Sequence, residues 1–169
     1  MNTSEKVIML DAAKTVFFKA MLAGYANGSD SDMVVKVKTP DGYTTITFAY
    51  GDFVVVDRYC VTPYSDFSAG TTTISYNCNP IWIMFYTGYY PKKVIPFLKM
   101  TLADQYSKGI FFGGRGAHCG MNNENEHLFY WNICERNRFS YFLGREHIID
   151  LRKPNVELGH HRYLGMSLL

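Results

Sequence analysis

The segment Pro80–Tyr86 constrains the fold more than any other part of the sequence, because it is apolar on both faces of an extended strand. Successive side chains of a strand point to opposite faces, so Trp82, Met84 and Tyr86 share one face and three large apolar residues share the other. Such a strand is typical of the centre of a sheet that is covered on both sides. We expect a helix to cover one face, and a second layer, a subunit or a ligand to cover the other.

Two helices and further strands are expected around this segment. Apolar residues at three- and four-residue spacing predict a helix over residues 4–25 and a second one over 92–106, where Pro91 suits the first turn. Turn residues such as those of Pro40-Asp41-Gly42 separate the strands. The predicted strands are 33–38, 43–50, 53–59, 71–76, 80–86, 127–134, 138–142, 145–151 and 155–163.

The second half of the chain repeats the order of strands and turns seen in the first half. Gly70 recurs as Gly144, 74 residues later, and Pro80 recurs as Pro154 at the same spacing. Hairpins that use the same turn chemistry give similar patterns without duplication, which is the alternative explanation. We predict an α+β fold with one domain over residues 1–169. It consists of two pseudo-repeated halves, about 1–88 and 89–169, each with a helix and an antiparallel meander.

Composition and charge limit the class of protein. A chain of 169 residues with 47% hydrophobic and 16% aromatic residues is an ordered globular domain. The formal net charge is +2 and the basic residues are scattered, so there is no clear nucleic-acid signal. We see no signal peptide and no apolar stretch of about 18 residues that would cross a membrane. Together with four widely spaced cysteines, this predicts a cytoplasmic protein with free thiols.

Several short motifs carry a family resemblance through their order and spacing. They are Tyr50-Gly51-Asp52-Phe53, Asp57-Arg58-Tyr59, Phe67-x-x-Gly70, Pro80-Ile81-Trp82-Ile83-Met84, Tyr86-x-Gly88, Phe142-x-Gly144-Arg145-Glu146-x-Ile148 and Tyr163-x-Gly165. From about Phe17 to Gly165 the chain resembles the uncharacterised family catalogued as domain of unknown function 5680. The resemblance implies a bacterial, phage or other mobile-element protein and supplies no catalytic residues. The sequence departs from the family pattern at Phe85, where the family tends to have Asn.

The glycine-rich segment Gly113–Gly120 supplies the alternative hypothesis, an enzyme. Successive backbone N–H groups of such a loop could cradle an anion, and Arg115 adds a positive charge. The segment lacks the Gly-Lys-Ser/Thr of a phosphate-binding loop. An enzyme of this kind would use Arg115 with His118 and Cys119. The competing interpretation is an ordinary connection between a helix and a strand.

Histidines and cysteines form no recognised metal-binding pattern. Zinc-ligand residue types occur at His118, Cys119, His127 and Cys134. Their spacing matches none of the paired zinc patterns. A nucleophilic pair of Cys119 with His118 or His127 requires that the side chains meet in space. We therefore expect no metal and no cofactor, and we assign no catalytic residue.

An aromatic set on paired strands gives the most informative candidate site. Tyr59, Trp82, Tyr86 and Tyr163 combine apolar rings with polar atoms, a combination favoured in pockets and interfaces, although ordinary core positions would explain them too. Acceptors there would be Asp57 and Glu146, and the repeat would place Trp82 and Tyr86 against Val156 and Tyr163.

We predict a non-enzymatic binding module for a small molecule or a host-protein partner, such as a mobile-element-encoded inhibitor or regulator. Its predicted contact residues are Asp57, Tyr59, Trp82, Tyr86, Arg115 and Tyr163. A homodimer or other homo-oligomer is also compatible with the apolar central strand.

Overall fold

The computed structural model describes residues 1–26, 33–116, 119–120 and 127–169, which form two helices and one antiparallel sheet. Helix α1 spans Thr3–Met21 and runs into the π-helical turn η1, Leu22–Ala26. The 3-10 turn η2, Lys92–Val94, leads into α2, Ile95–Ser107. The strands are β1 (Val34–Lys38), β2 (Tyr43–Tyr50), β3 (Phe53–Val61), β4 (Phe67–Tyr76), β5 (Asn79–Tyr89), β6 (Cys119–Gly120), β7 (Leu128–Arg138), β8 (Tyr141–Asp150) and β9 (Lys153–Ser167).

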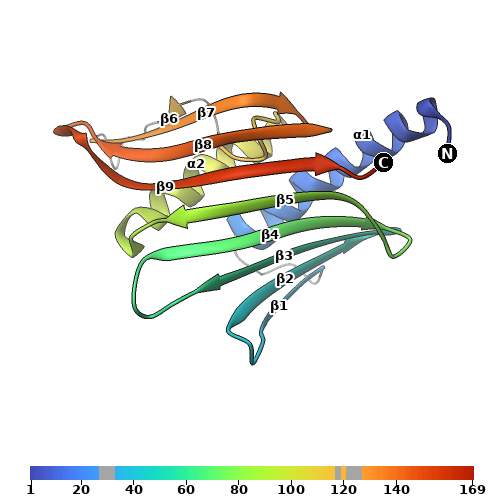
Figure 1. The fold of residues 1–169 in the computed structure, drawn as a ribbon, viewed down its shortest axis with the longest axis horizontal. Coiled ribbons are helices and arrows are strands. Elements are labelled where there is room, and N and C mark those ends of the chain that lie inside the picture. Colours follow the sequence, from blue (N-terminus) through green and yellow to red (C-terminus); the bar gives the residue numbers. More distant parts are fainter. Residues whose placement is uncertain (27–32, 117–118, 121–126) are drawn as a thin grey trace.

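The sheet consists of two meanders that meet at its centre. Its strand order is β1-β2-β3-β4-β5-β9-β8-β7-β6, and β6 contributes only the pairs of Cys119 and Gly120 with β7 (Figure 1). The junction is the antiparallel pairing of β5 with β9, in which Tyr86 lies opposite Tyr163. The predicted α+β class is confirmed. In the described chain, neither helix is long and apolar enough to cross a membrane.

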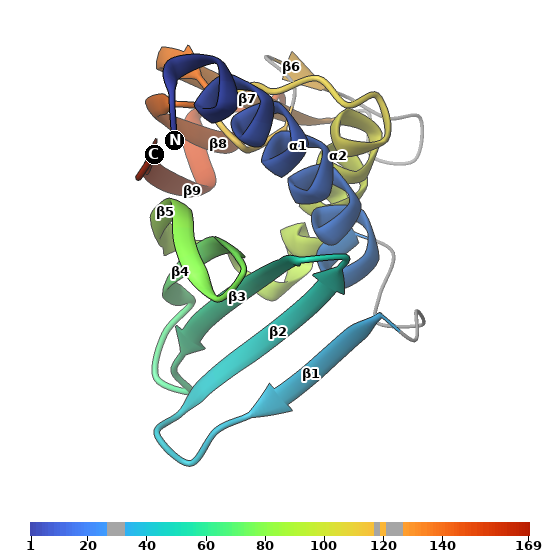
Figure 2. The same ribbon diagram turned by 90° about the vertical axis from the view of Figure 1, so that its right-hand side faces the viewer.

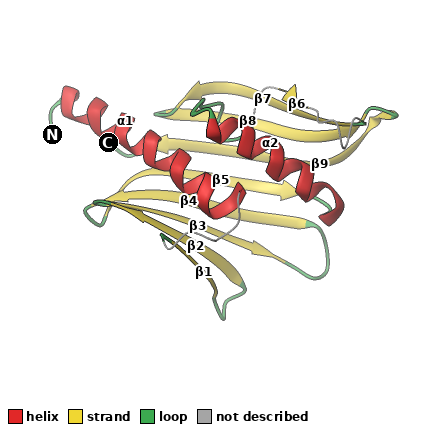
Figure 3. Ribbon diagram, turned by 180° about the vertical axis from the view of Figure 1, so that it is seen from behind, coloured by secondary structure: helices red, strands yellow, loops and turns green. Residues whose placement is uncertain are grey.

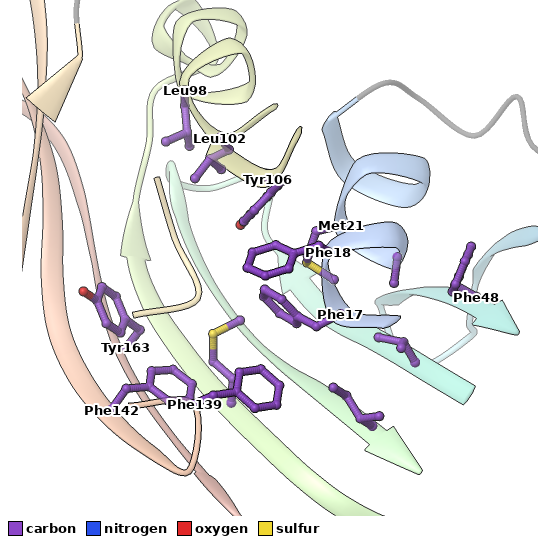
Figure 4. Close-up of a cluster of buried hydrophobic side chains, with 14 of the residues drawn as sticks. Phe17, Phe18, Met21, Phe48, Leu98, Leu102, Tyr106, Phe139, Phe142 and Tyr163 are labelled. Atoms are coloured by element: carbon purple, nitrogen blue, oxygen red, sulfur yellow. The ribbon is translucent and has the colours of Figure 1, made fainter. Parts of the chain in front are cut away.

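Both helices lie on the same face of the sheet, which we call the inner face, and the opposite face is the outer face. The sheet bends around the helices (Figure 2), and both of them cross the inner face (Figure 3). The core forms between these two layers, where Phe17 of α1 and Leu102 of α2 are fully buried (Figure 4). Because α1 and α2 bury one face each against the same sheet, the fold has two layers.

Strand β5 is central, as its sequence predicts, and the helices cover one of its faces, as expected. A second layer, one of the three covers expected for the other face, is absent from the described chain, and cover by a subunit or a ligand stays a prediction. On the inner face Trp82 and Met84 are 0% and 1% exposed, whereas Phe85 on the outer face is 48% exposed. Phe85 lies opposite Leu164 of β9, so its partial burial comes from neighbours within the sheet. No second layer of the described chain lies over this face.

Two sequence predictions are corrected by the strand register. The predicted strand over 138–142 is wrong because the chain turns between β7 and β8. At that turn the ring of Phe139 stacks on Trp82 with centroids 4.9 Å apart, and this burial draws the turn into the core. The expected contact of Trp82 with Val156 is also wrong, since Trp82 lies opposite Ser167.

Candidate functional site

A buried ion pair between Arg115 and Glu146 lies at the inner face of β8. Nε and Nη2 of Arg115 donate to Oε1 of Glu146 at 2.9 and 2.5 Å, and the two side chains are 6% and 0% exposed. Tyr130 donates to the other carboxylate oxygen at 2.5 Å and accepts from the N–H of Gly116. Both oxygens of Glu146 therefore have donors, which is what a buried charge requires.

The charges of this cluster suit it to a structural role. Burial raises the pKa of Glu146, but the charge and hydrogen bonds of Arg115 lower it more, and the net pKa lies below the ordinary value. Burial and the charge of Glu146 raise the pKa of Tyr130 well above its ordinary value. At neutral pH the cluster is thus an ionised pair with a neutral phenol, and neither partner is poised to exchange a proton.

His161 extends this cluster toward Ser68. Its Nδ1 lies 3.6 Å from Oε1 of Glu146 and 3.5 Å from Nη2 of Arg115, and its Nε2 lies 3.0 Å from Oγ of Ser68. Burial first, and then the charge of Arg115, lower the pKa of His161 to about 3. The imidazole is therefore neutral near pH 7, with one ring nitrogen that donates and one that accepts.

The arrangement of Ser68, His161 and Glu146 resembles a serine–histidine–acid catalytic relay, but the electrostatics of this site oppose that chemistry. A general base works best when its pKa lies near the working pH, and His161 falls far below this range. Glu146 already accepts from Arg115 and Tyr130 at short distances, so its 3.6 Å contact with His161 is secondary. The arrangement suits hydrogen-bond recognition better than nucleophile activation.

A second polar cluster lies beside the first, on the strands of the other meander. Oδ1 of Asp57 accepts from the hydroxyls of Thr72 and Tyr86 at 2.8 and 2.9 Å. Burial raises the pKa of Asp57, opposed by these two hydrogen bonds and by the charge of Arg115. A cavity of about 30 Å³ separates Asp57 from Arg115 and His161.

A cleft opens beside this cluster, between the start of α2 and strands β1 to β5. We call its first part the tyrosine pocket, a space of about 260 Å³ lined by Tyr59, Ser68, Tyr86 and His161 among others. The second part is the loop pocket, a space of about 550 Å³ bordered by the β1–β2 and β3–β4 connections. The two pockets share Val61, Asp66, Tyr90 and Ile95, so they form one continuous cleft.

The charged residues that line the cleft are mostly lysines. Lys36 and Lys99 line the tyrosine pocket, and Lys38 and Lys92 line the loop pocket. Asp66 is the acidic residue among the described lining residues. Because β1 supplies one lysine of each pair and η2 or α2 the other, positive charge comes from both sides of the cleft.

Some of the predicted contact residues lie near this cleft and others lie in the core. Tyr59 and Tyr86 line the tyrosine pocket, and Asp57 lies behind Tyr86. Trp82 is buried and donates through Nε1 to the carbonyl of Phe139 at 2.7 Å.

The remaining predicted contacts, Tyr163 and Arg115, belong to the other meander. Tyr163 is buried and donates to Oδ1 of Asn132 at 2.6 Å. Arg115 is bound by Glu146, and its side chain lines the cavity of about 30 Å³ together with His161.

Sequence reasoning missed Ser68, His161 and the lysines of the cleft. His160 and His161 point to opposite faces of β9, as successive strand residues do, since His160 contacts Glu157 and His161 faces the core. A usable signal was the alternation of Lys36 and Lys38 along a strand, which places both on one face. Nothing in the sequence brings residues from β1, β4, β9 and α2 to one point, because that depends on strand order.

The glycine-rich segment is engaged with the sheet where it is described. The N–H of Gly113 donates to Oδ1 of Asn137, and the N–H of Gly116 donates to Tyr130. These two donors therefore already have acceptors within the protein. His118 and the side chain of Cys119 lie outside the described residues. Among the residues that are described, no group of three or more potential metal ligands occurs.

Comparison of the chain with family models, with curated proteins and with solved structures gives no match in any of the three. The resemblance to the family of unknown function therefore stays a prediction. What can be inferred about function depends on the cleft and on the polar clusters behind it.

Proposed function

We propose that the protein is a non-enzymatic binding module that holds a small molecule in the cleft. The observation that carries this proposal is the tyrosine pocket, which reaches from surface lysines to half-buried Ser68 and buried His161. Sites for small molecules are concave, have mainly apolar walls and contain a few fixed polar groups. The tyrosine pocket has these three properties.

The walls and the polar end of the pocket suit a flat organic compound. Tyr59, Tyr86 and Tyr90 supply aromatic walls, and Ser68 and His161 supply hydrogen-bonding atoms. Tyr90 packs edge-on against His161 with centroids 4.8 Å apart, and Tyr86 lies 5.7 Å from the same ring. Because these rings hold the imidazole of His161 in place, His161 loses little conformational freedom when a ligand binds, which favours affinity.

We also propose that the two halves are pseudo-repeats, because corresponding hydrogen bonds lie on either side of the junction of β5 and β9. Tyr86 lies opposite Tyr163, and each hydroxyl donates to a side chain two strands away, Asp57 or Asn132. Asn132 in turn donates to the carbonyl groups of Phe112 and Gly116. Residues 108–116 thus cover part of the inner face of the second half, at the place that corresponds to the cleft of the first half.

Fragment binding followed by nuclear magnetic resonance (NMR) tests the binding proposal. A set of small neutral aromatic compounds should shift the signals of Ser68 and His161 and raise the melting temperature of the protein. Tyr59→Ala should weaken this binding about tenfold or more, because it removes one aromatic wall. The matched control is Tyr141→Ala, at a 45% exposed tyrosine of β8 that lines neither pocket, and it should change the affinity by less than about twofold. Fragments that bind only at other sites would contradict the proposal.

A protein partner is the second candidate, and the outer face of the sheet favours it. Phe85, Leu164 and Met166 are exposed there on neighbouring strands, in a region that no helix covers. A shallow groove of about 520 Å³ crosses this region, with Arg58 and Arg162 among its lining residues. Exposed apolar patches of this kind are typical of protein interfaces.

Sedimentation equilibrium tests the simplest version of this second candidate, a homodimer. If two copies associate through this patch, Leu164→Glu should shift the protein toward monomer without lowering its melting temperature substantially. A wild-type chain that remains monomeric at high concentration would exclude self-association through the patch.

A further inference from the structure

We infer that the ligand of the cleft is a nucleotide-like polyanion, an aromatic ring that carries two or more phosphate or similar anionic groups. The ring would occupy the tyrosine pocket, and the anionic groups would extend along the lysines into the loop pocket. This inference rests on the proposed function and adds the chemical class of the ligand.

The distribution of charge is the first argument. The chain has a formal net charge of only +2, yet the described charged lining of the cleft is four lysines and Asp66. Lysine ammonium groups bind phosphate as compact point charges. Because one lysine pair lines each pocket, the positive charge extends along the cleft, and a ligand with a single anionic group would meet only part of it.

The aromatic walls are the second argument. Stacking of a base on an aromatic side chain contributes about 1–3 kcal/mol for each base and tolerates different bases. Tyr59 and Tyr86, which are both half-buried, offer such surfaces in the tyrosine pocket.

The polar end of the tyrosine pocket is the third argument. The hydroxyl of Ser68 both donates and accepts, and neutral His161 has one donor and one acceptor nitrogen. The edge of a nucleobase carries donors and acceptors side by side, so it matches this end of the pocket better than a simple hydrocarbon ring does.

Size is the fourth argument. Pockets for drug-sized ligands occupy about 300–1,000 Å³. The tyrosine pocket alone, at about 260 Å³, is slightly smaller than this range. The loop pocket adds a space of about 550 Å³ that is continuous with it. A ring with a chain of anionic groups is long enough to occupy two joined spaces, each of which is lined by a pair of lysines.

Isothermal titration calorimetry with a graded series of compounds tests the inference. The probes are a nucleoside, its monophosphate and its triphosphate, each with adenine, guanine and uracil, together with inorganic tripolyphosphate. For at least one base, affinity should rise about tenfold or more from nucleoside to triphosphate. Binding of the triphosphate should weaken several-fold between about 50 mM and about 200 mM salt.

Two double variants separate the cleft from general surface charge. Lys38→Ala with Lys92→Ala should weaken triphosphate binding about tenfold and change nucleoside binding by less than about twofold. The control, Lys6→Ala with Lys153→Ala, removes two exposed lysines outside the cleft and should leave both affinities unchanged. All four lysines are exposed, so both variants should keep the wild-type melting temperature.

The possible outcomes distinguish this inference from the binding proposal. Equal affinity for nucleoside and triphosphate would overturn the polyanion and keep the small-molecule site. Tripolyphosphate that binds as tightly as the triphosphates would overturn the role of the ring. If neutral fragments bind in the tyrosine pocket and none of the nucleotides binds with a Kd below about 1 mM, the inferred ligand class is wrong. If the fragments also fail to bind there, the binding proposal itself is wrong.

Discussion

Tyr86 and Tyr163 lie opposite each other at the junction of β5 and β9, and their hydroxyls extend in opposite directions, to Asp57 of β3 and to Asn132 of β7. Each tyrosine ring lies over a glycine of the intervening strand, Gly70 or Gly144. The two hydrogen bonds therefore connect both meanders to the central strand pair.

The close approach of ring and glycine predicts that a methyl group is not tolerated there. A Cβ at Gly144 would lie 2.3 Å from the hydroxyl oxygen of Tyr163 and 2.4 Å from the carbonyl oxygen of Ile133. Gly144→Ala should lower the free energy of unfolding by about 1–3 kcal/mol, because a ring and a paired backbone would both have to move. Urea denaturation measures this, and a variant as stable as the wild type would contradict the described packing.

The burial of the ion pair of Arg115 and Glu146 predicts that breaking it lowers the free energy of unfolding much more than breaking an exposed salt bridge does. Arg115→Ala should lower the free energy of unfolding by about 3–5 kcal/mol, because Glu146 would keep a buried charge without its partner. The matched control is Arg152→Ala, in the pair with Asp150 whose arginine is 67% exposed, and it should cost about 1 kcal/mol or less. Chemical denaturation compares the two, and equal effects would mean that Glu146 is accessible to water.

The low pKa of His161 predicts that stability falls as the pH is lowered. In the unfolded chain histidine takes up a proton near pH 6.5, whereas the folded protein resists protonation until the pKa of about 3. This contribution to stability is therefore complete above pH 6.5 and is lost progressively as the pH falls toward 3. Glu146, whose pKa is also lowered in the fold, adds to the loss in the acidic part of this window.

His161→Gln should remove the histidine part of this pH dependence. The difference in stability between about pH 7 and about pH 4 should become smaller in the variant by a few kcal/mol. Urea unfolding at several pH values measures it. If wild type and variant lose stability in parallel, His161 is already protonated in the folded protein.

Truncation of adjacent residues of β5 should destabilise the protein by unequal amounts, because both helices lie on the same face of the sheet. Met84→Ala should cost about 2–5 kcal/mol, since Met84 is 1% exposed in the core. Phe85→Ala on the outer face should cost much less, about 1 kcal/mol, because its ring is 48% exposed. Thermal unfolding of the two variants distinguishes them, and a large loss for Phe85→Ala would indicate that a subunit or another layer covers the outer face.

Local sequence patterns were sufficient for the class of the fold and for most of its elements. The spacing of Val94, Leu98 and Leu102 predicts α2, and Pro80–Tyr86 predicts a central strand. These predictions succeed because helix and strand periodicities are properties of a few neighbouring residues. The apolar outer face of β5 did not decide between a second layer, a subunit and a ligand as its cover. The described chain has no second layer there, and the other two stay predictions.

The candidate site was less accessible to sequence reasoning. Asp57, Tyr59 and Tyr86 were expected near a ligand, and they lie in or behind the tyrosine pocket. His161 and Ser68 were not expected, because they are 93 residues apart and meet only through the pairing of β4, β5 and β9. Trp82 was expected at the same site because its indole N–H could bind a ligand, but this N–H donates to the carbonyl of Phe139 instead.

The central position of β9 has a consequence for how the protein is made. β9 follows every other strand of the sequence, yet it pairs with β5 on one side and β8 on the other. While the chain emerges from the ribosome, β5 keeps an open, aromatic-rich edge until residues 153–167 have been synthesised. An unpaired edge next to a hydrophobic surface invites pairing with other chains. We therefore expect mispairing with other chains to be most frequent before β9 pairs with β5 and β8, the last step in the completion of the sheet.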